Sequence, residues 1–205
     1  MSREMIIAAP VDDRMRSALR IIDLLLHPLF DKIVIPGKSK ESCVLCSLTV
    51  RDFLWRVGWK DATCTTVYMM VVAHDPKGNE IWSLGVGDHT DIPTVDKRPI
   101  PDTATRWSGH MVVEVPSAGI IIDTTMYPAR REYWPHLPGM VAAQIDNDGP
   151  VSYGLKPVAG LASDDDKGSV RVVWLRQQNK RWQQAPDAVR ARRLPVVKAM
   201  LEAMR

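Results

Sequence analysis

Residues 110–123 read HMVVEVPSAGIIID, two β-rich arms separated by the turn-forming pair Pro116-Ser117. The pattern predicts two short strands, His110–Val115 and Gly119–Asp123, paired as an antiparallel hairpin. If the turn is centred on the Pro-Ser pair, His110 lies directly opposite Asp123, with Cβ atoms about 5 Å apart. The hairpin therefore predicts an antiparallel sheet with an imidazole–carboxylate hydrogen bond at its open end. The alternative interpretation is an ordinary hairpin with a surface histidine.

Two helices are predicted before this hairpin. Apolar residues recur at helical spacing over residues 12–34, a helix that Pro28 is expected to kink or end. A second, mostly buried helix is expected over residues 43–57, with Gly58 just beyond its end and Asp52 on its solvent side. The remaining predicted elements are strands over 63–73, 80–84, 151–155 and 170–176, and short helices over 187–193 and 195–204. Because helices precede mostly antiparallel strands, the order predicts an α+β fold rather than a doubly wound sheet.

Composition narrows the class of protein. The chain of 205 residues is 45% apolar and 25% charged, close to the average of soluble globular proteins, which argues against a disordered or fibrous chain. No stretch approaches the roughly 18 apolar residues of a membrane helix, and the N-terminus lacks the apolar core of a signal peptide. The three cysteines form no disulfide framework. We therefore expect a cytoplasmic protein without membrane contact, in an oligomeric state that the composition leaves open.

The C-terminal segment is basic. Residues 176–205 hold eight Lys and Arg residues against two Asp and Glu residues, a net charge of +6 that leaves −3 for the rest of a chain whose total is +3. Such a segment can contact nucleic acid. We interpret it instead as a solvated helix face, in a basic helical extension, about residues 177–205, of a single domain over residues 1–205.

Cys43 is the candidate nucleophile. It stands at the first turn of the second predicted helix, just after a loop over residues 36–40. The partial positive charge and free amide groups of a helix start stabilise a thiolate and an oxyanion, and a nearby imidazolium would complete a thiolate–imidazolium pair. The alternative is a small buried hydrophobe, which is the preferred interpretation of Cys64 inside a predicted strand.

Three blocks of the sequence resemble the transglutaminase-like superfamily of papain-like cysteine enzymes. The first block is a Cys that opens a helix, with a Gly fifteen positions later, here Cys43 and Gly58. The second is His-x-x-Val-Glu-Val, here residues 110–115, and the third is Asp-Pro-Thr after an apolar strand, here residues 123–125. Their order and spacing agree with the family over roughly residues 40–125.

The resemblance implies a papain-like, transglutaminase-like fold, in which the nucleophile helix packs on an antiparallel sheet. It implies a catalytic triad with Cys43 as nucleophile, His110 as general base and acid, and Asp123 as the residue that orients His110. The reaction would be acyl transfer through a thioester, from a peptide, protein or small-molecule acyl donor and without a cofactor. Hydrolysis, as in a cysteine hydrolase, amidase or protease, is expected over crosslinking, because water needs no second binding site.

The sequence departs from the family at several positions next to the proposed catalytic residues. Glu41 stands where the family often has Gly, and Thr124 stands where it has Pro. No Gln precedes the Cys, so the side chain that would complete an oxyanion hole is unassigned, and Lys40, Ser42 and Trp107 are the candidates. No calcium-loop pattern appears, so a metal-regulated crosslinking enzyme is not indicated.

Other functions fit parts of the pattern. Cys43-x-x-Cys46 at a helix start is also the arrangement of a thiol–disulfide oxidoreductase. A non-catalytic binding scaffold of the same fold is a further alternative, and an arylamine acetyltransferase would share the Cys, His, Asp order. A zinc site is less favoured, because no second close-spaced ligand pair is present. Among the other histidines, His89 beside Asp88 and Asp91 is the main competitor of the hairpin histidine.

Overall fold

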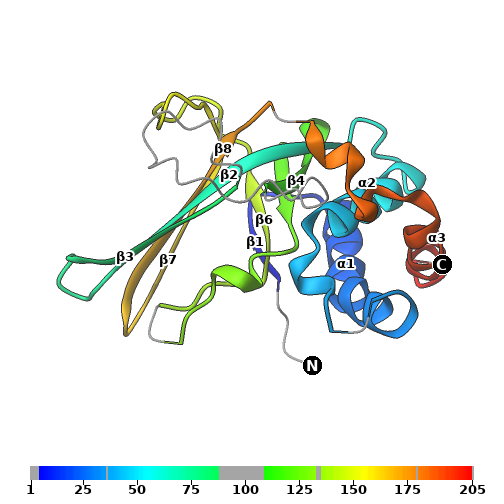
Figure 1. Cartoon of the computed structure of the whole chain (residues 1–205), viewed down its shortest axis with the longest axis horizontal. Coiled ribbons are helices and arrows are strands. Elements are labelled where there is room, and N and C mark those ends of the chain that lie inside the picture. The colour runs from blue at the N-terminus through cyan, green and yellow to red at the C-terminus, as the bar shows by residue number, and fades with distance from the viewer. Residues whose placement is uncertain (1–4, 36, 88–108, 133–134, 179, 205) are drawn as a thin grey trace.

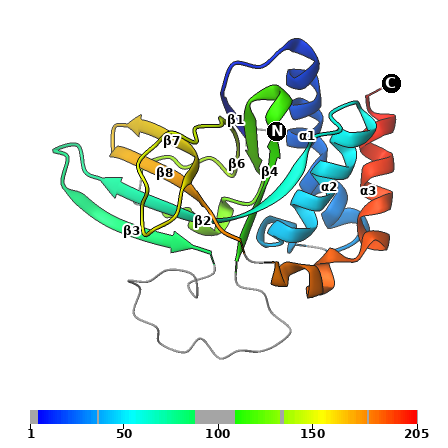
Figure 2. The ribbon, with the colours of Figure 1, turned by 90° about the horizontal axis from the view of Figure 1, so that it is seen from above.

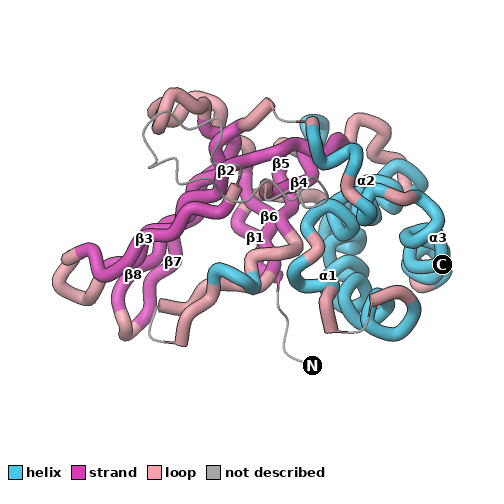
Figure 3. Tube along the Cα trace, viewed as in Figure 1, coloured by secondary structure: helices cyan, strands magenta, loops and turns pink. Residues whose placement is uncertain are grey.

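The computed structural model describes residues 5–35, 37–87, 109–132, 135–178 and 180–204. Within these residues the fold is α+β, as predicted: three α-helices lie together on one side of an eight-stranded sheet (Figures 1 and 3). The strands are β1 (Met5–Ala8), β2 (Thr63–His74), β3 (Glu80–Val86), β4 (His110–Val115), β5 (Ile120–Asp123), β6 (Met140–Gln144), β7 (Pro157–Asp165) and β8 (Gly168–Arg176). The helices are α1 (Asp13–Ile33), α2 (Cys43–Arg56) and α3 (Arg190–Glu202), with short 3₁₀ turns η1 (Ser39–Glu41), η3 (Pro116–Ala118), η4 (Tyr127–Ala129), η5 (Arg181–Gln184) and η6 (Pro186–Ala188).

The sheet has the strand order β1-β6-β5-β4-β2-β8-β7, with β3 paired to the free part of β2. Every pair is antiparallel except β1 with β6. The sheet curls until it is nearly closed, because Ile145, just after β6, bridges Ala159 in β7. Three of these strands, β1, β6 and β7, were not predicted, and the predicted strand at 151–155 is a turn closed by a bridge between Ser152 and Leu155.

The curled sheet separates two cores. Alternate residues of β4 and β5, such as Val113 and Ile122, face the helices and join the larger core with α1, α2 and α3. Their neighbours, such as Val112 and Ile121, face the inside of the curl and pack with β2, β7 and β8. Figure 2 shows the three helices side by side against β4, while the paired strands β2–β3 and β7–β8 extend away from them. The alternation follows from the two-residue period of a strand.

Helix α1 continues past Pro28, which was predicted to kink or end it. Asp12 caps its start, with Oδ1 accepting from the Met15 amide at 2.6 Å. Pro28 lies on the exposed side of the helix, where water can satisfy the carbonyl that proline leaves without a donor. The opposite side of the same turn carries Leu26 and Phe30, both fully buried. Burial of these side chains outweighs the missing hydrogen bond, so the helix continues.

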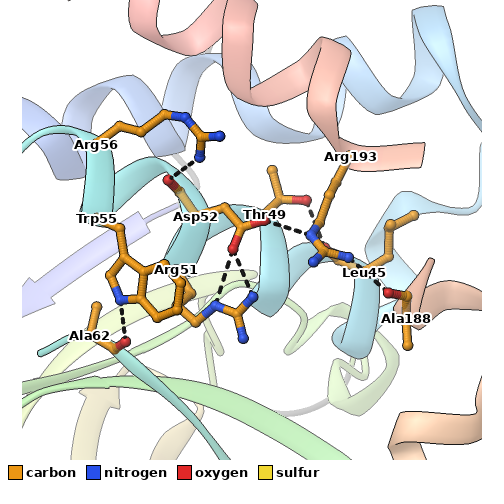
Figure 4. A network of polar contacts seen from close by, with 9 residues as sticks. All are labelled: Leu45, Thr49, Arg51, Asp52, Trp55, Arg56, Ala62, Ala188 and Arg193. Atoms are coloured by element: carbon orange, nitrogen blue, oxygen red, sulfur yellow. Dashed lines mark hydrogen bonds and ion pairs between the residues drawn. The ribbon is translucent and has the colours of Figure 1, made fainter. Parts of the chain in front are cut away.

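The solvent side predicted for α2 is covered by α3. One continuous helix replaces the two short ones predicted at the C-terminus, and it includes Pro195. Asp52 is therefore buried, and it accepts from Arg193 Nε at 2.7 Å and from Arg51 Nη2 at 2.7 Å (Figure 4). Burial would raise the pKa of the Asp52 carboxyl, but the two guanidinium groups hold it below its usual value.

The basic C-terminal segment is therefore part of the helical layer. Val196, Val197 and Met200 of α3 enter the larger core, and Arg193 is buried, whereas the other cations of α3, such as Arg192 and Lys198, are exposed as predicted. In the described parts of the chain no helix is long and apolar enough to cross a membrane.

Candidate active site

The predicted contact between His110 and Asp123 forms, but in a different register. The turn is the 3₁₀ turn η3 followed by Gly119 at φ +65°, so Val115 pairs with Ile120, two residues later than predicted. A shift of two residues leaves every side chain on its original face of the sheet. His110 and Asp123 therefore stay on the same face and meet diagonally across the strand pair rather than directly opposite each other.

The Asp123 carboxylate is buried and held by several donors. His110 Nε2 lies 2.6 Å from Oδ2, and Trp174 Nε1 donates to the same oxygen at 2.8 Å. The Thr125 amide donates to Oδ1 at 3.0 Å. Trp174 and Asp123 have no exposed surface, and the exposed fraction of His110 is 3%. Such an arrangement fixes both the orientation of the imidazole and the nitrogen that it turns towards the carboxylate.

The electrostatics favour an ionised pair. Burial by itself would lower the pKa of His110, but the charge of Asp123, its hydrogen bond, and the hydrogen bond and charge of Cys43 raise it to about 10. Burial likewise opposes ionisation of Asp123, yet His110 and the donors Thr125 and Trp174 lower the pKa of this carboxyl. His110 is thus held as an imidazolium by the buried carboxylate, with Nε2 on Asp123 and Nδ1 left for Cys43.

Cys43 reaches this pair from the first turn of α2. It is half-buried, and its Sγ lies 3.6 Å from the carbonyl oxygen of Gly109, the residue before His110. The first amides of a helix have no acceptor within the helix, so they are available to a negative charge beside the first residue. The three residues singled out from the sequence therefore lie together, with α2 supplying Cys43, β4 supplying His110 and β5 supplying Asp123.

The other two thiols are held in their neutral form. Cys46 is fully buried and donates to the Ser39 carbonyl at 3.3 Å, and burial raises its pKa well above the usual value. Burial also raises the pKa of Cys64 to about 12. All three cysteines are free thiols.

The candidates for an oxyanion contact have other partners. Ser42 precedes α2, but its hydroxyl donates to the Lys38 carbonyl at 3.1 Å instead of capping the helix. Lys40 Nζ lies over the ring of Tyr127, 4.3 Å from its centroid. Trp107 lies outside the described residues, as does the competing histidine His89 with its two aspartates.

Trp174 is the member of the site that the sequence analysis missed. Its position in a predicted strand was correct, and in register it lies beside Met69 on the face shared with Asp123. The pairing of β8 with β2 joins residues about a hundred positions apart, and no local sequence pattern predicts such a pairing. Thr125 was part of a recognised block, whereas its amide contact with the carboxylate was not predicted.

The described residues contain no group of three or more His, Cys, Asp and Glu side chains that could hold a metal ion. In comparisons with known proteins, no family model, no curated protein and no solved structure matches the chain. The functional interpretation therefore depends on the geometry of these side chains and on the sequence blocks that carry them.

Proposed function

We propose that the protein is a cysteine-dependent acyl-transfer enzyme with a transglutaminase-like, papain-like arrangement of Cys43, His110 and Asp123. One observation carries this proposal: a fully buried imidazole–carboxylate contact of 2.6 Å whose imidazole also bonds to the thiol at a helix start. A buried histidine with one carboxylate and one thiol partner matches the base, orienter and nucleophile of thiol-dependent acyl transfer.

The proposed reaction begins with the thiolate of Cys43 and the imidazolium of His110. Sulfur forms a bond to the carbonyl carbon of an amide or ester, and the amides at the start of α2 stabilise the resulting oxyanion. His110 gives its proton to the leaving amine or alcohol as the bond from carbon to nitrogen or oxygen breaks, which leaves a thioester on Cys43. Water then attacks the thioester while His110 accepts its proton, and the carbon–sulfur bond breaks to release the acid.

Asp123 stays ionised throughout this cycle. The contacts from Trp174 and Thr125 keep its carboxylate fixed while the charge on His110 changes. Hydrolysis is favoured over transfer to a second substrate because water requires no binding site of its own. The acyl donor belongs to the class of peptides, proteins or small amides and esters.

A thiol–disulfide oxidoreductase that uses Cys43 and Cys46 is less well supported. The second thiol of such a pair must be able to attack a mixed disulfide as a thiolate. Cys46 is fully buried, bonds to the Ser39 carbonyl, and has a raised pKa because of its burial. These features suit a packed side chain better than a resolving thiol.

The proposal is tested with a panel of ester, thioester and amide acyl donors, followed by trapping of the acylated protein and peptide mass spectrometry. We expect the acyl group on Cys43 and no turnover in Cys43→Ser or His110→Ala. Cys64→Ser is the matched control, and it should retain turnover because that thiol is neutral and lies on a strand. Acylation spread over all cysteines, or unaffected by His110→Ala, would contradict the proposal.

A further inference from the structure

A second buried polar chain lies behind the candidate site, on α1. Asp31 Oδ1 accepts from the Ser39 hydroxyl at 3.0 Å, and the same hydroxyl oxygen lies 3.0 Å from His27 Nδ1. His27 Nε2 in turn lies 2.8 Å from the carbonyl oxygen of Thr124. His27, Ser39 and Thr124 are all at least 96% buried, so their polar groups bond to one another instead of to water.

One end of this chain reaches the segment that leads to Cys43. Ser39 begins η1, and its carbonyl accepts from the Ser42 amide at 3.1 Å and from the Cys46 thiol at 3.3 Å. Ser42 in turn accepts the first hydrogen bond of α2, from the Cys46 amide at 3.0 Å. The position of Ser39 therefore determines where α2 begins, and with it the position of Cys43.

The other end reaches the segment that holds Asp123. Thr124 lies between Asp123 and Thr125, whose amide binds the carboxylate. His27 thus bonds both to the segment before the nucleophile and to the segment after the orienting carboxylate.

The shape of the imidazole explains why a histidine fits this position. The Thr124 carbonyl can only accept, so Nε2 of His27 carries a hydrogen. The second ring nitrogen, Nδ1, points in the other direction and contacts the Ser39 hydroxyl, which also donates to Asp31. An imidazole therefore reaches both partners at once, whereas an amide side chain of similar length replaces only one of the two contacts.

An aromatic ring lies between His27 and two cations of neighbouring elements. The edge of the Tyr127 ring lies against His27, with centroids 5.2 Å apart, and Lys40 and Arg130 lie over Tyr127. On α1, Asp31 is the acidic member of this set of hydrogen bonds, and it contacts Ser39. Ser39 therefore lies between the Asp31 carboxylate and His27, and the Tyr127 ring lies between the two cations and His27.

We propose that His27 is a positioning residue of the candidate active site, which holds the segments of Cys43 and Asp123 at a fixed separation through Ser39 and the Thr124 carbonyl. This inference depends on the proposed function, since it assigns His27 a role in the reactivity of Cys43. His27 does not touch the reacting atoms, and its effect passes through the backbone on both sides.

The test measures alkylation of Cys43 by iodoacetamide at pH 6 and pH 9, with peptide mass spectrometry to resolve the three thiols. In the wild type we expect the rate at pH 6 to remain a large fraction of the rate at pH 9, because the imidazolium of His110 stabilises the thiolate. His27→Gln and Ser39→Ala should each lower the rate at pH 6 about tenfold, as is typical for residues that orient reacting groups, with a smaller change at pH 9. The double variant should add little further loss, because both substitutions remove the same contact.

Ile22→Ala is the matched control, since Ile22 is fully buried on α1 but lies in the helical core. It should lower the unfolding temperature and leave the ratio of the two rates unchanged. Ser39→Ala keeps His27 in place, so it provides the same readout if His27→Gln does not fold. A loss of the pH 6 rate in Ile22→Ala equal to that in His27→Gln would make the effect one of general stability and overturn the inference.

The two proposals fail in different ways. His110→Ala is measured in parallel, and it should lower the rate at pH 6 far below the rate at pH 9. If His110→Ala lowers the pH 6 rate in this way while His27→Gln and Ser39→Ala react as the wild type does, the role of His27 is wrong and the proposed function stands. If His110→Ala also reacts as the wild type does, the proposed function is wrong, and the role of His27 fails with it.

Discussion

Trp174 and His110 share one acceptor: the indole nitrogen and the imidazole Nε2 lie 2.8 Å and 2.6 Å from the same oxygen of Asp123. The indole comes from β8 and the imidazole from β4, with β2 between the two strands in the sheet. The shared oxygen means that the direction of the imidazole depends on a side chain two strands away. Any loosening of the carboxylate would therefore be transmitted to Cys43 through His110.

Trp174→Phe tests this dependence. The substitution keeps most of the packed ring and removes the N–H donor, so Asp123 retains fewer fixed contacts. We expect acylation of Cys43 to slow about tenfold, and the free energy of unfolding to fall by about 1–3 kcal/mol. Chemical denaturation and the acyl-donor assay measure the two effects. Trp82→Phe, at a tryptophan that is 43% exposed on β3, is the control and should change neither.

The ionised pair also predicts a pH dependence of stability. The pKa of His110 is raised to about 10 in the folded protein, against about 6.5 in an unfolded chain. Its contribution is therefore complete below about pH 6.5 and is lost as the pH rises towards 10. The pKa of Asp123 is lowered, so its contribution is present above the unfolded value, about 3.9, and is lost as the pH falls through its folded pKa.

The thiol of Cys43 is removed for this test, because a thiolate beside His110 would release one proton on folding and cancel the proton that His110 binds. In Cys43→Ser, where Asp123 still faces the imidazole, we expect the free energy of unfolding to decrease between pH 6.5 and pH 8, with a slope of up to about 1 kcal/mol per pH unit. This window lies below the range in which unfolded thiols ionise, so Cys46 and Cys64 contribute little to the slope. Urea denaturation of Cys43→Ser and of Cys43→Ser/His110→Asn over this window measures the contribution of His110. Equal slopes in the two proteins would mean that the imidazole is not held as an imidazolium.

The three thiols should differ in their rates of alkylation, because they differ in burial. At pH 7 and limiting iodoacetamide, Cys43 should be labelled first, because burial raises the pKa of Cys46 and raises that of Cys64 to about 12. Peptide mass spectrometry at early times measures the order. Equal labelling of Cys43 and Cys46, together with a reducible bond between them, would favour the oxidoreductase alternative.

The ion pair between α2 and α3 predicts a large effect on stability. Arg193→Met leaves the buried carboxylate of Asp52 with Arg51 alone, so the free energy of unfolding should fall by about 3–5 kcal/mol. The double variant Asp52→Leu/Arg193→Met should recover much of this loss, because no charge stays buried. Arg192→Met, which removes an exposed pair with Asp187, should cost about 0–1 kcal/mol in the same denaturation experiment.

These contacts mark what could and could not be predicted from the sequence. The face shared by His110 and Asp123 was predictable, because strand parity survives an error of two residues in register. The register itself was wrong, because a 3₁₀ turn ending in a left-handed Gly119 replaced the two-residue turn that was assumed. The prediction of the contact thus depended on periodicity and not on the turn type.

Contacts between distant segments were not predictable in the same way. Asp52 was assigned to solvent because the charged residues of α2 gather on its side of the helix, and the partner that covers it, Arg193, is 141 residues further along the chain. Strand β6 has five residues, of which two are alanine, and five of the nine residues of β7 are alanine, glycine or aspartate. These residues are depleted in strands in general, so neither segment has the composition of a strand. Pairing with β5 and β8 imposes the extended conformation that the local composition does not favour.

A final set of variants separates the three classes of function. In the acyl-transfer proposal, Cys43→Ser and His110→Ala each abolish turnover, since nucleophile and base act as one unit. Asp123→Asn should leave more residual activity, because Asp123 orients rather than reacts; a similar change in a serine triad lowers kcat by about 10⁴. Cys46→Ser should leave turnover nearly unchanged, with some loss of stability because the side chain is fully buried.

The alternatives reverse these outcomes. In an oxidoreductase, Cys46 would be the resolving thiol, so Cys46→Ser would trap mixed disulfides while His110→Ala stayed active. In a binding scaffold, all of the variants that fold would keep the native activity. The decisive comparison is Cys46→Ser against His110→Ala in one assay with stability measured in parallel. If Cys46→Ser is inactive and His110→Ala is active, the contact between His110 and Asp123 serves the fold alone, and the nucleophile at the start of α2 acts in redox chemistry.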